Sequence, residues 1–256
     1  MIIDKVKTQA LALDQTAGGL KIERLELGAK YLGVELEDGR CGVCFRFDPD
    51  TFGEIGGWEL PSSFQGAAAA DLIPWAGDNH SLLRSGIGIA VINALTPWDE
   101  MASRVPKDSA EAAGIQAGDV VGMVGFFPPL VRMLGERDDI DFRIFERSFR
   151  EPHPCLYPDW SEHRLLPECD VVIMTGTSGI NSTLDQMLSW CTGAREVSVT
   201  GPSTMMYPSA YEGTNATILA GAKYLPKKMD EMFEAVSSGR CGNEILRYLE
   251  KYAYRL

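Results

Sequence analysis

The feature of this sequence that most restricts its fold is a series of short apolar runs after residue 118, separated by helix-like or loop segments. The runs are DVVGMVGFF, DFRIFE, CDVVIMTG, REVSVTG and ATILAGAKYL. Uninterrupted runs of this length are typical of strands that are buried on both faces of a parallel sheet. Parallel neighbours need crossover connections, which the intervening segments can supply. This part of the chain therefore predicts an α/β fold with a mainly parallel, Rossmann-like sheet.

The first part of the chain has a different pattern. Its apolar residues recur at helical spacing in IIDKVKTQALAL, and the strand-like runs KIERLEL, AKYLGVELE and GRCGVCFRF follow. Asp38-Gly39 separates the last two runs and is a typical hairpin turn. Two helical segments, AAAADLIPWA and SLLRSGIGIAVINAL, complete an α+β unit, and small residues in the second allow close packing. We therefore predict two domains, residues 1–95 and 96–256.

The end of the chain reads as amphipathic helix. KKMDEMFEAVSSG and NEILRYLEKYAYRL both place apolar residues at intervals of three and four. These two segments predict helices that close the second domain.

Charge and composition exclude several classes of partner. The 256 residues carry a formal net charge of -12, with 45% hydrophobic and 23% charged residues. A surface this acidic repels phosphate backbones and anionic lipids, so we expect neither nucleic acid nor membrane as partner. Charged residues interrupt the first segment where a signal peptide needs an apolar run, which predicts a cytoplasmic protein. A homo-oligomer remains an open alternative.

The first candidate site follows the run that contains Gly122 and Gly125. Phe126 comes next, and Pro128 would lie in the first turn of the following helix, where proline is tolerated. About 20 residues after Gly125, a strand ends in Glu146; an acid at this place binds ribose hydroxyls in dinucleotide-binding folds. Only part of the glycine fingerprint is present, so an ordinary strand–helix turn is an equal alternative. The pattern names no particular cofactor.

The second candidate is the polar stretch after CDVVIM. Thr175, Gly176 and Thr177 end the strand, and a helix is predicted to begin near Asn181. Hydroxyl groups and free backbone N–H groups at the start of a helix form an anion site. The structural alternative is that Asn181 merely caps the helix.

The third candidate is the turn Gly201-Pro202-Ser203 after REVSVT, for which the alternative is a turn stabilised by serine or threonine side chains. All three stretches follow strands. In a parallel sheet they converge on one edge, where open α/β sheets bind ligands. This convergence predicts one ligand site.

Metal-binding patterns are weak. Cys41 and Cys44 form one C-x-x-C pair where a zinc site needs four ligands, and in a strand they would face opposite sides. A loop site from His153, Cys155 and His163 is conceivable, but a surface connection is the commoner outcome for such a proline-rich segment. The identity of any metal therefore stays open. The chain has no H-E-x-x-H, G-x-S-x-G or Walker lysine motif.

Taken together, these motifs resemble the heavy-metal chelation family, whose members have no established activity. The resemblance runs over nearly the whole chain, through NAL, MVGFFPP, DVVIMTGTSGINSTLD and GPSTMMYP. It implies an enolase N-terminal-like domain followed by a Rossmann-like domain, with a site between them. It also implies heavy-metal chelation, or condensation or hydrolysis of pterin-, flavin- or siderophore-like molecules.

The leading hypothesis is a protein or enzyme that acts on an anionic or metal-chelating small molecule in an interdomain cleft. Glu146, Asn181 and Ser203 are the candidate catalytic residues. The candidate binding residues are Asn93, Gly122, Gly125, Phe126, Pro128, Thr175, Gly176, Thr177, Gly201 and Pro202. One alternative is a non-catalytic metal- or metallophore-binding protein. Another is a methyltransferase-like enzyme, although the chain lacks the glycine-rich first motif of methyltransferases.

Overall fold

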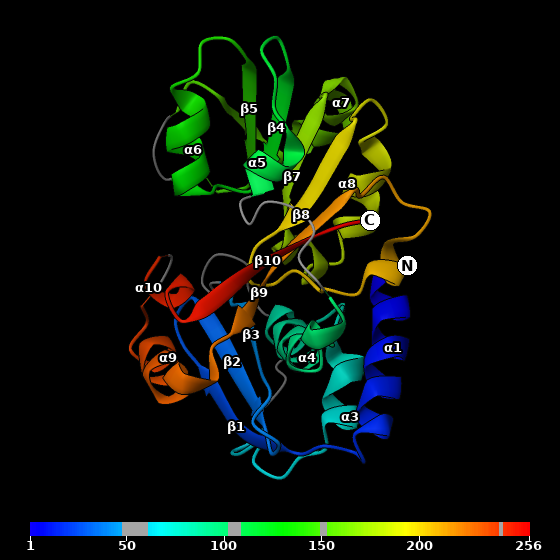
Figure 1. Ribbon diagram of the computed structural model, residues 1–256, viewed down its shortest axis with the longest axis vertical. Helices are drawn as coiled ribbons and strands as arrows, with labels where there is room; N and C mark the ends of the chain where they lie inside the picture. Colours follow the sequence, from blue (N-terminus) through cyan, green and yellow to red (C-terminus); the bar gives the residue numbers. More distant parts are fainter. Residues whose placement is uncertain (48–60, 102–108, 149–152, 241–242) are drawn as a thin grey trace.

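The computed structural model describes residues 1–47, 61–101, 109–148, 153–240 and 243–256, and shows a mixed α/β protein with one small and one large sheet (Figure 1). The predicted fold class is confirmed. The elements of the first part are α1 (Ile2–Thr16), β1 (Ile22–Leu27), β2 (Tyr31–Leu36), β3 (Cys41–Phe45), α3 (Ala69–Leu72), the 3₁₀ helix η1 (Ile73–Trp75) and α4 (Leu82–Ala94).

The small sheet is an antiparallel meander in the order β1-β2-β3. Its β2–β3 turn is the predicted Asp38-Gly39 hairpin: Gly39 has φ +84° and its N–H donates to the Leu36 carbonyl at 2.8 Å. Helix α4 packs directly on β3, because a Cβ placed on Gly42 would lie 2.0 Å from the Ala90 carbonyl oxygen. Only glycine permits this approach. The three predicted strands and the close helix packing are confirmed.

The second part contains the large sheet. Its elements are η2 (Trp98–Glu100), α5 (Ser109–Ala113), β4 (Val120–Val124), α6 (Pro128–Gly135), β5 (Asp141–Glu146), β6 (Leu156–Pro158), η3 (Asp159–Ser161), α7 (Glu162–Leu165), η4 (Leu166–Glu168), β7 (Val171–Thr175), η5 (Gly176–Gly179), α8 (Leu184–Trp190), β8 (Glu196–Thr200), η6 (Pro208–Tyr211), β9 (Ile218–Tyr224), η7 (Pro226–Lys228), α9 (Met229–Ser237), α10 (Asn243–Leu246) and β10 (Leu249–Arg255).

The strand order of the large sheet is β10-β9-β8-β7-β4-β5-β6, and every neighbouring pair is parallel except β9 and β10. The chain runs outward from β4 to β6 and then returns to β7 on the other side of β4. Doubly wound nucleotide-binding sheets have this order for their first six strands. The order reverses between β4 and β7, and such a reversal leaves a crevice beyond the carboxyl ends of the strands.

Helices cover both faces of the large sheet, as its continuous apolar runs predict. Residues of α5 and α6 pack on one face with Ile173 of β7. The neighbouring residues Val172 and Met174 face the opposite side and share a core with α8. Alternate residues of each strand therefore contact different helices.

The end of the chain differs from the prediction. Instead of a second long helix, the structure has the four-residue helix α10 and then β10, which pairs with β9 from Leu249–Tyr224 to Arg255–Ile218. The helical interpretation was wrong because LEKYAYR also alternates as a strand and contains tyrosines, which favour strands. Without β10, the edge of β9 would leave its backbone N–H and C=O groups unpaired. Pairing with this edge favours the strand over the helix for the last residues.

The two sheets share a core. One continuous apolar cluster includes Val34 and Ile92 from the first part and Met205 and Tyr207 from the second. Helix α9 lies on the side of the small sheet opposite α4, although it follows the large sheet in the chain (Figure 1). The division into domains 1–95 and 96–256 stays a proposal. Every described helix is too short or too polar to span a lipid bilayer.

Candidate functional site

The bends after β4, β7 and β8 touch one another at the carboxyl edge of the large sheet, which we call the rim. Gly125 has φ +88°, and a Cβ placed on it would lie 3.1 Å from Cβ and Cγ2 of Thr175. A Cβ placed on Gly176 would lie 2.6 Å from the backbone nitrogen of Thr204. The backbone of Gly176 therefore packs directly on the backbone of Thr204, and Gly125 packs closely on the Thr175 side chain.

The ring of Phe127 joins the outer two bends. Its Cε2 lies 3.8 Å from the Cβ position of Gly125, and its Cε1 lies 3.9 Å from that of Gly201. Phe126 is the neighbouring residue and is 43% exposed. One phenylalanine therefore packs between the loops, and the other offers an aromatic face to solvent.

Glu146 ends β5 beside these bends, and backbone amides hold its carboxylate. Oε2 accepts from Phe126 N–H at 3.1 Å, and Oε1 accepts from Arg147 N–H at 2.7 Å and Ser148 N–H at 3.2 Å. Three donors orient the carboxylate while Oε2 keeps acceptor capacity. The strand end and the bend after β4 are thus linked through one side chain.

The polar stretch after β7 folds differently from the prediction. Thr175 caps the 3₁₀ helix η5, accepting from Thr177 N–H at 3.3 Å, and the two threonine hydroxyls lie 3.0 Å apart. Helix α8 begins only at Leu184, so the expectation of a helix start near Asn181 was wrong by three residues. The side chain of Asn181 accepts from Thr183 N–H and Oγ1–H, and this local turn delays the helix.

Two of the candidate residues bridge the two parts of the chain. Asn93 Nδ2 donates to the carbonyls of Val43 at 3.1 Å and Pro202 at 3.2 Å, and Ser203 Oγ accepts from Phe45 N–H at 2.9 Å. We call this set of contacts the seam. Asn93 and Ser203 are both buried. These hydrogen bonds join the two parts of the chain at the junction between the sheets.

The last two candidates are Gly122 and Pro128. Gly122 is in the middle of β4, where a Cβ would meet Sγ of Cys169 at 2.8 Å, so it serves sheet–helix packing. Pro128 begins α6 as expected and is exposed. The structure therefore brings Gly125, Phe126, Glu146, Thr175–Thr177 and Gly201–Ser203 together, and it leaves Gly122 in the core.

Sequence reasoning missed a group of polar residues next to Glu146. Arg147 Nε lies 2.7 Å from Asp159 Oδ2; Arg147 follows β5, and Asp159 follows β6. Trp160 and Glu162 come directly after Asp159. The only signal was the short run LYP inside the proline-rich segment, which reads as a surface connection but forms β6. Once β6 is known, its carboxyl end belongs to the same rim.

Comparisons with known proteins agree with this architecture. Two family models, both described as "Putative heavy-metal chelation", match residues 10–96 and 108–255 respectively, and the second covers more than half of the chain. The chain belongs to this family. An uncharacterized protein of Methanocaldococcus jannaschii is 31% identical to the chain over 150 residues, and the match spans only 58% of each protein.

Two solved structures from the heavy-metal chelation family have the same fold. A protein of unknown function from Pyrococcus horikoshii covers the whole chain with a TM-score of 0.81. A second, from Desulfitobacterium hafniense, covers 93% with a TM-score of 0.76. Both are 23% identical to this chain, a level that shows the fold alone.

The five cysteines in the described part of the chain do not form the metal site that the family description suggests. Burial raises the pKa of Cys44, Cys169 and Cys191 to about 12, and it also raises the pKa of Cys41. A thiol must lose its proton to coordinate a metal, so these neutral buried thiols are poor ligands. Cys41 and Cys44 face different apolar clusters, as expected for strand positions. Cys241 lies outside the described residues.

His153 and His163 have different hydrogen-bond partners. His153 Nδ1 accepts from the Cys155 N–H at 3.3 Å, whereas Nδ1 of His163 lies 2.9 Å from the Trp160 carbonyl oxygen. Across the described ranges, no three His, Cys, Asp or Glu side chains form a group that could hold a metal ion.

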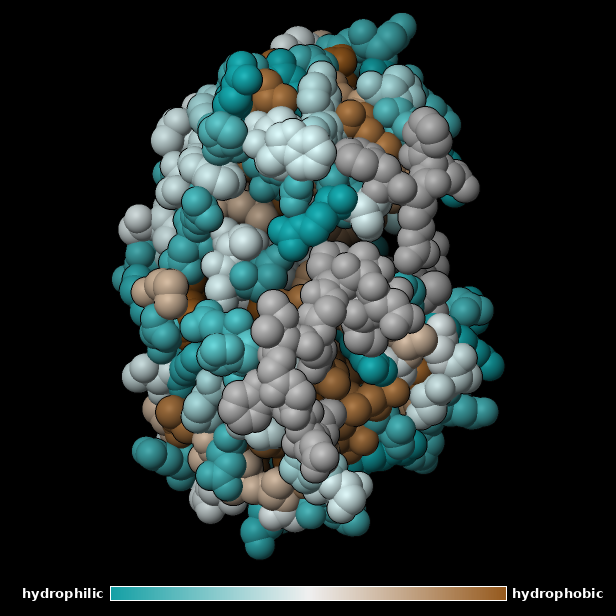
Figure 2. All heavy atoms as spheres, turned by 180° about the vertical axis from the view of Figure 1, so that it is seen from behind, coloured by the Kyte–Doolittle hydropathy of each residue, from teal (hydrophilic) through white to brown (hydrophobic). Residues whose placement is uncertain are grey.

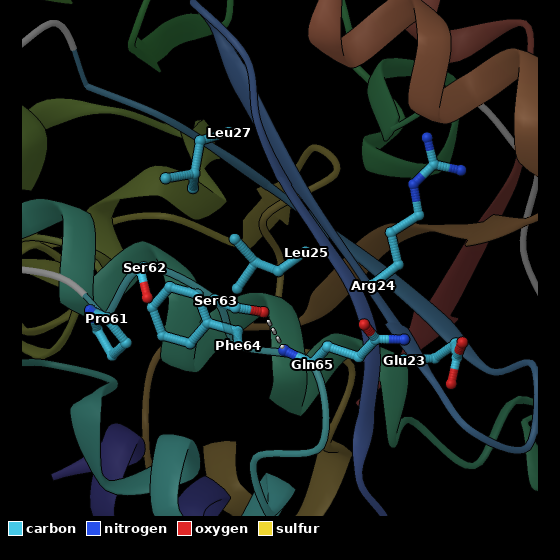
Figure 3. Close-up of a pocket in the computed structure, with 9 residues that line it drawn as sticks. All are labelled: Glu23, Arg24, Leu25, Leu27, Pro61, Ser62, Ser63, Phe64 and Gln65. Atoms are coloured by element: carbon cyan, nitrogen blue, oxygen red, sulfur yellow. Dashed lines mark hydrogen bonds between the residues drawn. The ribbon is translucent and has the colours of Figure 1, made fainter.

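A surface cavity of about 380 Å³ lies away from the rim, between β1 and residues 61–65 (Figure 3). Leu25 and Phe64 line it, while Arg24 points away and places its guanidinium 4.3 Å from the Phe233 ring centroid. Apolar surface gathers on this lower half of the molecule (Figure 2). The other lining residues are Glu23, Leu27, Pro61, Ser62, Ser63 and Gln65. No residue that the sequence singled out lines this cavity, so the rim remains the candidate site.

Proposed function

We propose that this protein binds a planar, anionic, metal-chelating small molecule at the rim, between the large sheet and the α4–β3 region. The observation that carries the proposal is the mutual contact of the bends at Gly125, Thr175 and Gly201. Because these loops touch, their polar groups lie close together next to β4 and β7, where the strand order reverses. Doubly wound sheets bind ligands at this place.

Thr175 and Thr177 supply the anion-binding part of the proposed site. Their hydroxyl groups lie 3.0 Å apart, and only one of them can donate to the other. The remaining hydroxyl proton is free to point at a ligand carboxylate or phosphate. Hydrogen bonds to charged groups are stronger than those between neutral groups, which favours an anionic ligand.

Glu146 and Phe126 supply the other contacts. Glu146 Oε2 accepts one backbone hydrogen bond and can accept another from a ligand hydroxyl group. The exposed ring of Phe126 offers a flat surface on which a heterocycle can stack. These features suit pterin-, flavin- or siderophore-like molecules, which combine flat rings with acidic and hydroxyl groups. If the bound molecule is also hydrolysed or condensed, Glu146 is the candidate base.

Asn93, Asn181 and Ser203 have positioning roles in this proposal. Asn181 holds the turn before α8, and Asn93 and Ser203 hold the seam. In the described part of the chain, Asn93 Oδ1 and Thr204 Oγ1 are buried without a hydrogen-bond partner. Buried oxygens usually have a partner, so these two support a ligand donor or ordered water at this point.

The family description favours a chelating ligand over direct metal binding by this chain. Four of its described thiols are buried with raised pKa values, and no three His, Cys, Asp or Glu side chains of the described residues form a metal-binding group. A bound small molecule can supply the metal ligands that the side chains do not. Non-catalytic binding of a metallophore is the second candidate function, and this observation favours it.

Calorimetry on the full chain tests the proposal. The probes are pterin-6-carboxylate, flavin mononucleotide and 2,3-dihydroxybenzoate. We expect at least one to bind, and Thr177→Val to weaken that binding about tenfold, because the valine keeps the shape but removes the hydroxyl group. Thr8→Val, at an exposed position of α1, is the matched control and should bind like the wild type. Absence of binding by all three probes, or equal binding by Thr177→Val, would contradict the proposal.

A further inference from the structure

Glu162 is a buried carboxylic acid at the rim that the sequence does not single out. It is the first residue of α7 and only 6% exposed. It follows β6 and η3, and β6 pairs in parallel with β5 so that Pro158 lies opposite Glu146. The residues after both strands therefore reach the same edge of the sheet.

Charged groups of the rim face Glu162. The groups that act on its carboxyl are Asp159 of η3, and Arg147 and Glu146 at the end of β5. From the interior side, the Cys191 thiol at the end of α8 lies within electrostatic range. The nearest cation, Arg147, is engaged by Asp159 at 2.7 Å.

Glu162 differs from those neighbours because its own carboxyl has no hydrogen-bond or ion-pair partner among the described residues. The side chain is mostly buried, but its carboxyl oxygens are not among the fully buried polar atoms without a partner, so they keep a little contact with solvent. Burial of a carboxylate that has no cationic partner favours the neutral acid. Burial is the main cause that raises the pKa of Glu162 to about 7, and Asp159 adds to it.

Trp160 adds an aromatic surface to this place. It is two residues before Glu162 and 72% exposed, the largest exposed fraction among the large hydrophobic side chains described. An exposed indole offers a surface on which a heterocyclic ring can stack. A nearby acid and ion pair can orient such a ring through hydrogen bonds. Arg147, Asp159, Trp160 and Glu162 all follow the neighbouring strands β5 and β6, whose carboxyl ends lie side by side.

We propose that Glu162 exchanges a proton with the molecule bound at the rim, which would then be a heterocycle with a ring nitrogen or carbonyl oxygen as acceptor. The neutral acid donates its O–H to that acceptor. When the proton transfers, the O–H bond of Glu162 breaks, the acceptor's lone pair forms the new bond, and the carboxylate left behind faces Arg147. This inference rests on the proposed function and adds the class of acceptor that the site recognises.

Carboxyl ¹³C NMR and calorimetry on the full-length chain test the inference together. The Glu162 resonance, identified by sequential assignment, should titrate near pH 7 in the wild type. Binding of flavin mononucleotide and pterin-6-carboxylate should weaken about tenfold between pH 6 and pH 8, because the fraction of neutral Glu162 falls by that factor. Glu162→Gln should lose this dependence, whereas Glu136→Gln, at an exposed position after α6, should keep it.

The outcomes separate the two proposals. Titration of Glu162 near pH 4, or binding by Glu162→Gln that keeps the wild-type pH dependence, overturns the inference and leaves the proposed function standing. Absence of binding by both probes at every pH overturns both. Loss of the pH dependence in Glu162→Gln alone supports both.

Discussion

Three carboxylates at the rim have different surroundings, and the surroundings set their chemistry. Asp159 pairs with Arg147, and Glu146 accepts three backbone hydrogen bonds. Glu162 has neither kind of partner and is buried. The same carboxyl group is therefore an ion-pair member, an oriented acceptor or a neutral acid according to its position.

The pKa of Glu162 predicts a pH-dependent stability. Its pKa rises from the ordinary 4.5 to about 7 in the folded state, so folding binds a proton between these values. The stabilising contribution is full below pH 4.5 and is lost as the pH rises through 7. Relative to Glu162→Gln, the wild type should therefore lose up to about 3 kcal/mol of unfolding free energy between pH 4.5 and pH 8.

Urea unfolding at several pH values measures this difference, with Glu136→Gln as the control. A difference between wild type and Glu162→Gln that stays constant from pH 4.5 to pH 8 would show that Glu162 is ionised in the folded protein.

At the scale of elements, the last part of the chain completes both sheets. Helix α9 covers the outer face of the small sheet. Its Phe233 is fully buried, and Cε1 of the ring would lie 3.1 Å from a Cβ placed on Gly33. β10 then pairs along the open edge of β9. The small sheet therefore depends on residues that lie almost 200 positions away in the chain.

Phe233→Ala should lower the free energy of unfolding by about 3–5 kcal/mol, since it removes a buried ring and leaves a cavity. The cation–π contact with Arg24 would be lost as well. Met133→Ala, at an exposed position of α6, should change stability by no more than about 0.5 kcal/mol. Chemical denaturation followed by circular dichroism gives both values. Equal effects of the two substitutions would show that α9 does not stabilise the small sheet.

At the scale of the whole molecule, the seam holds the two sheets in one arrangement. Tyr207 O–H donates to the Ile92 carbonyl at 2.8 Å, and Asn93 joins Val43 to Pro202. The bonds to Ile92 and Val43 are buried, the bond to Pro202 is partly buried, and all three lie beside a shared apolar core. The seam thus positions the bend after β8 relative to the other bends of the rim.

Asn93→Ala should cost about 1–3 kcal/mol of stability, because the buried Val43 carbonyl and the partly buried Pro202 carbonyl lose a donor. Hydrogen exchange should become faster both around β3 and in the bend after β8. Asn215→Ala, which removes a donor to the Leu188 carbonyl inside the large-sheet part, should affect only the region of α8. If Asn93→Ala accelerates hydrogen exchange only around β3, or only in the bend after β8, Asn93 does not bridge the two parts of the chain.

Local patterns in the sequence were sufficient for most of the elements and for the general place of the candidate site. Continuous apolar runs predicted the parallel strands, Asp38-Gly39 predicted its hairpin, and Gly125, Thr175 and Gly201 each followed a strand. These features depend on interactions between residues close together in the chain, so a short stretch of sequence is enough to predict them.

Only the tertiary structure decided the rest, because the deciding contacts join distant residues. The free edge of β9 selected the strand period of LEKYAYR over its helical period. Pairing with β5 made LYP a strand, and this brought Glu162 beside Glu146 and Arg147. The burial of Glu162, the pairing of Asn93 across the seam and the fit of Gly176 against Thr204 exist only after the chain has folded. No local pattern contains them.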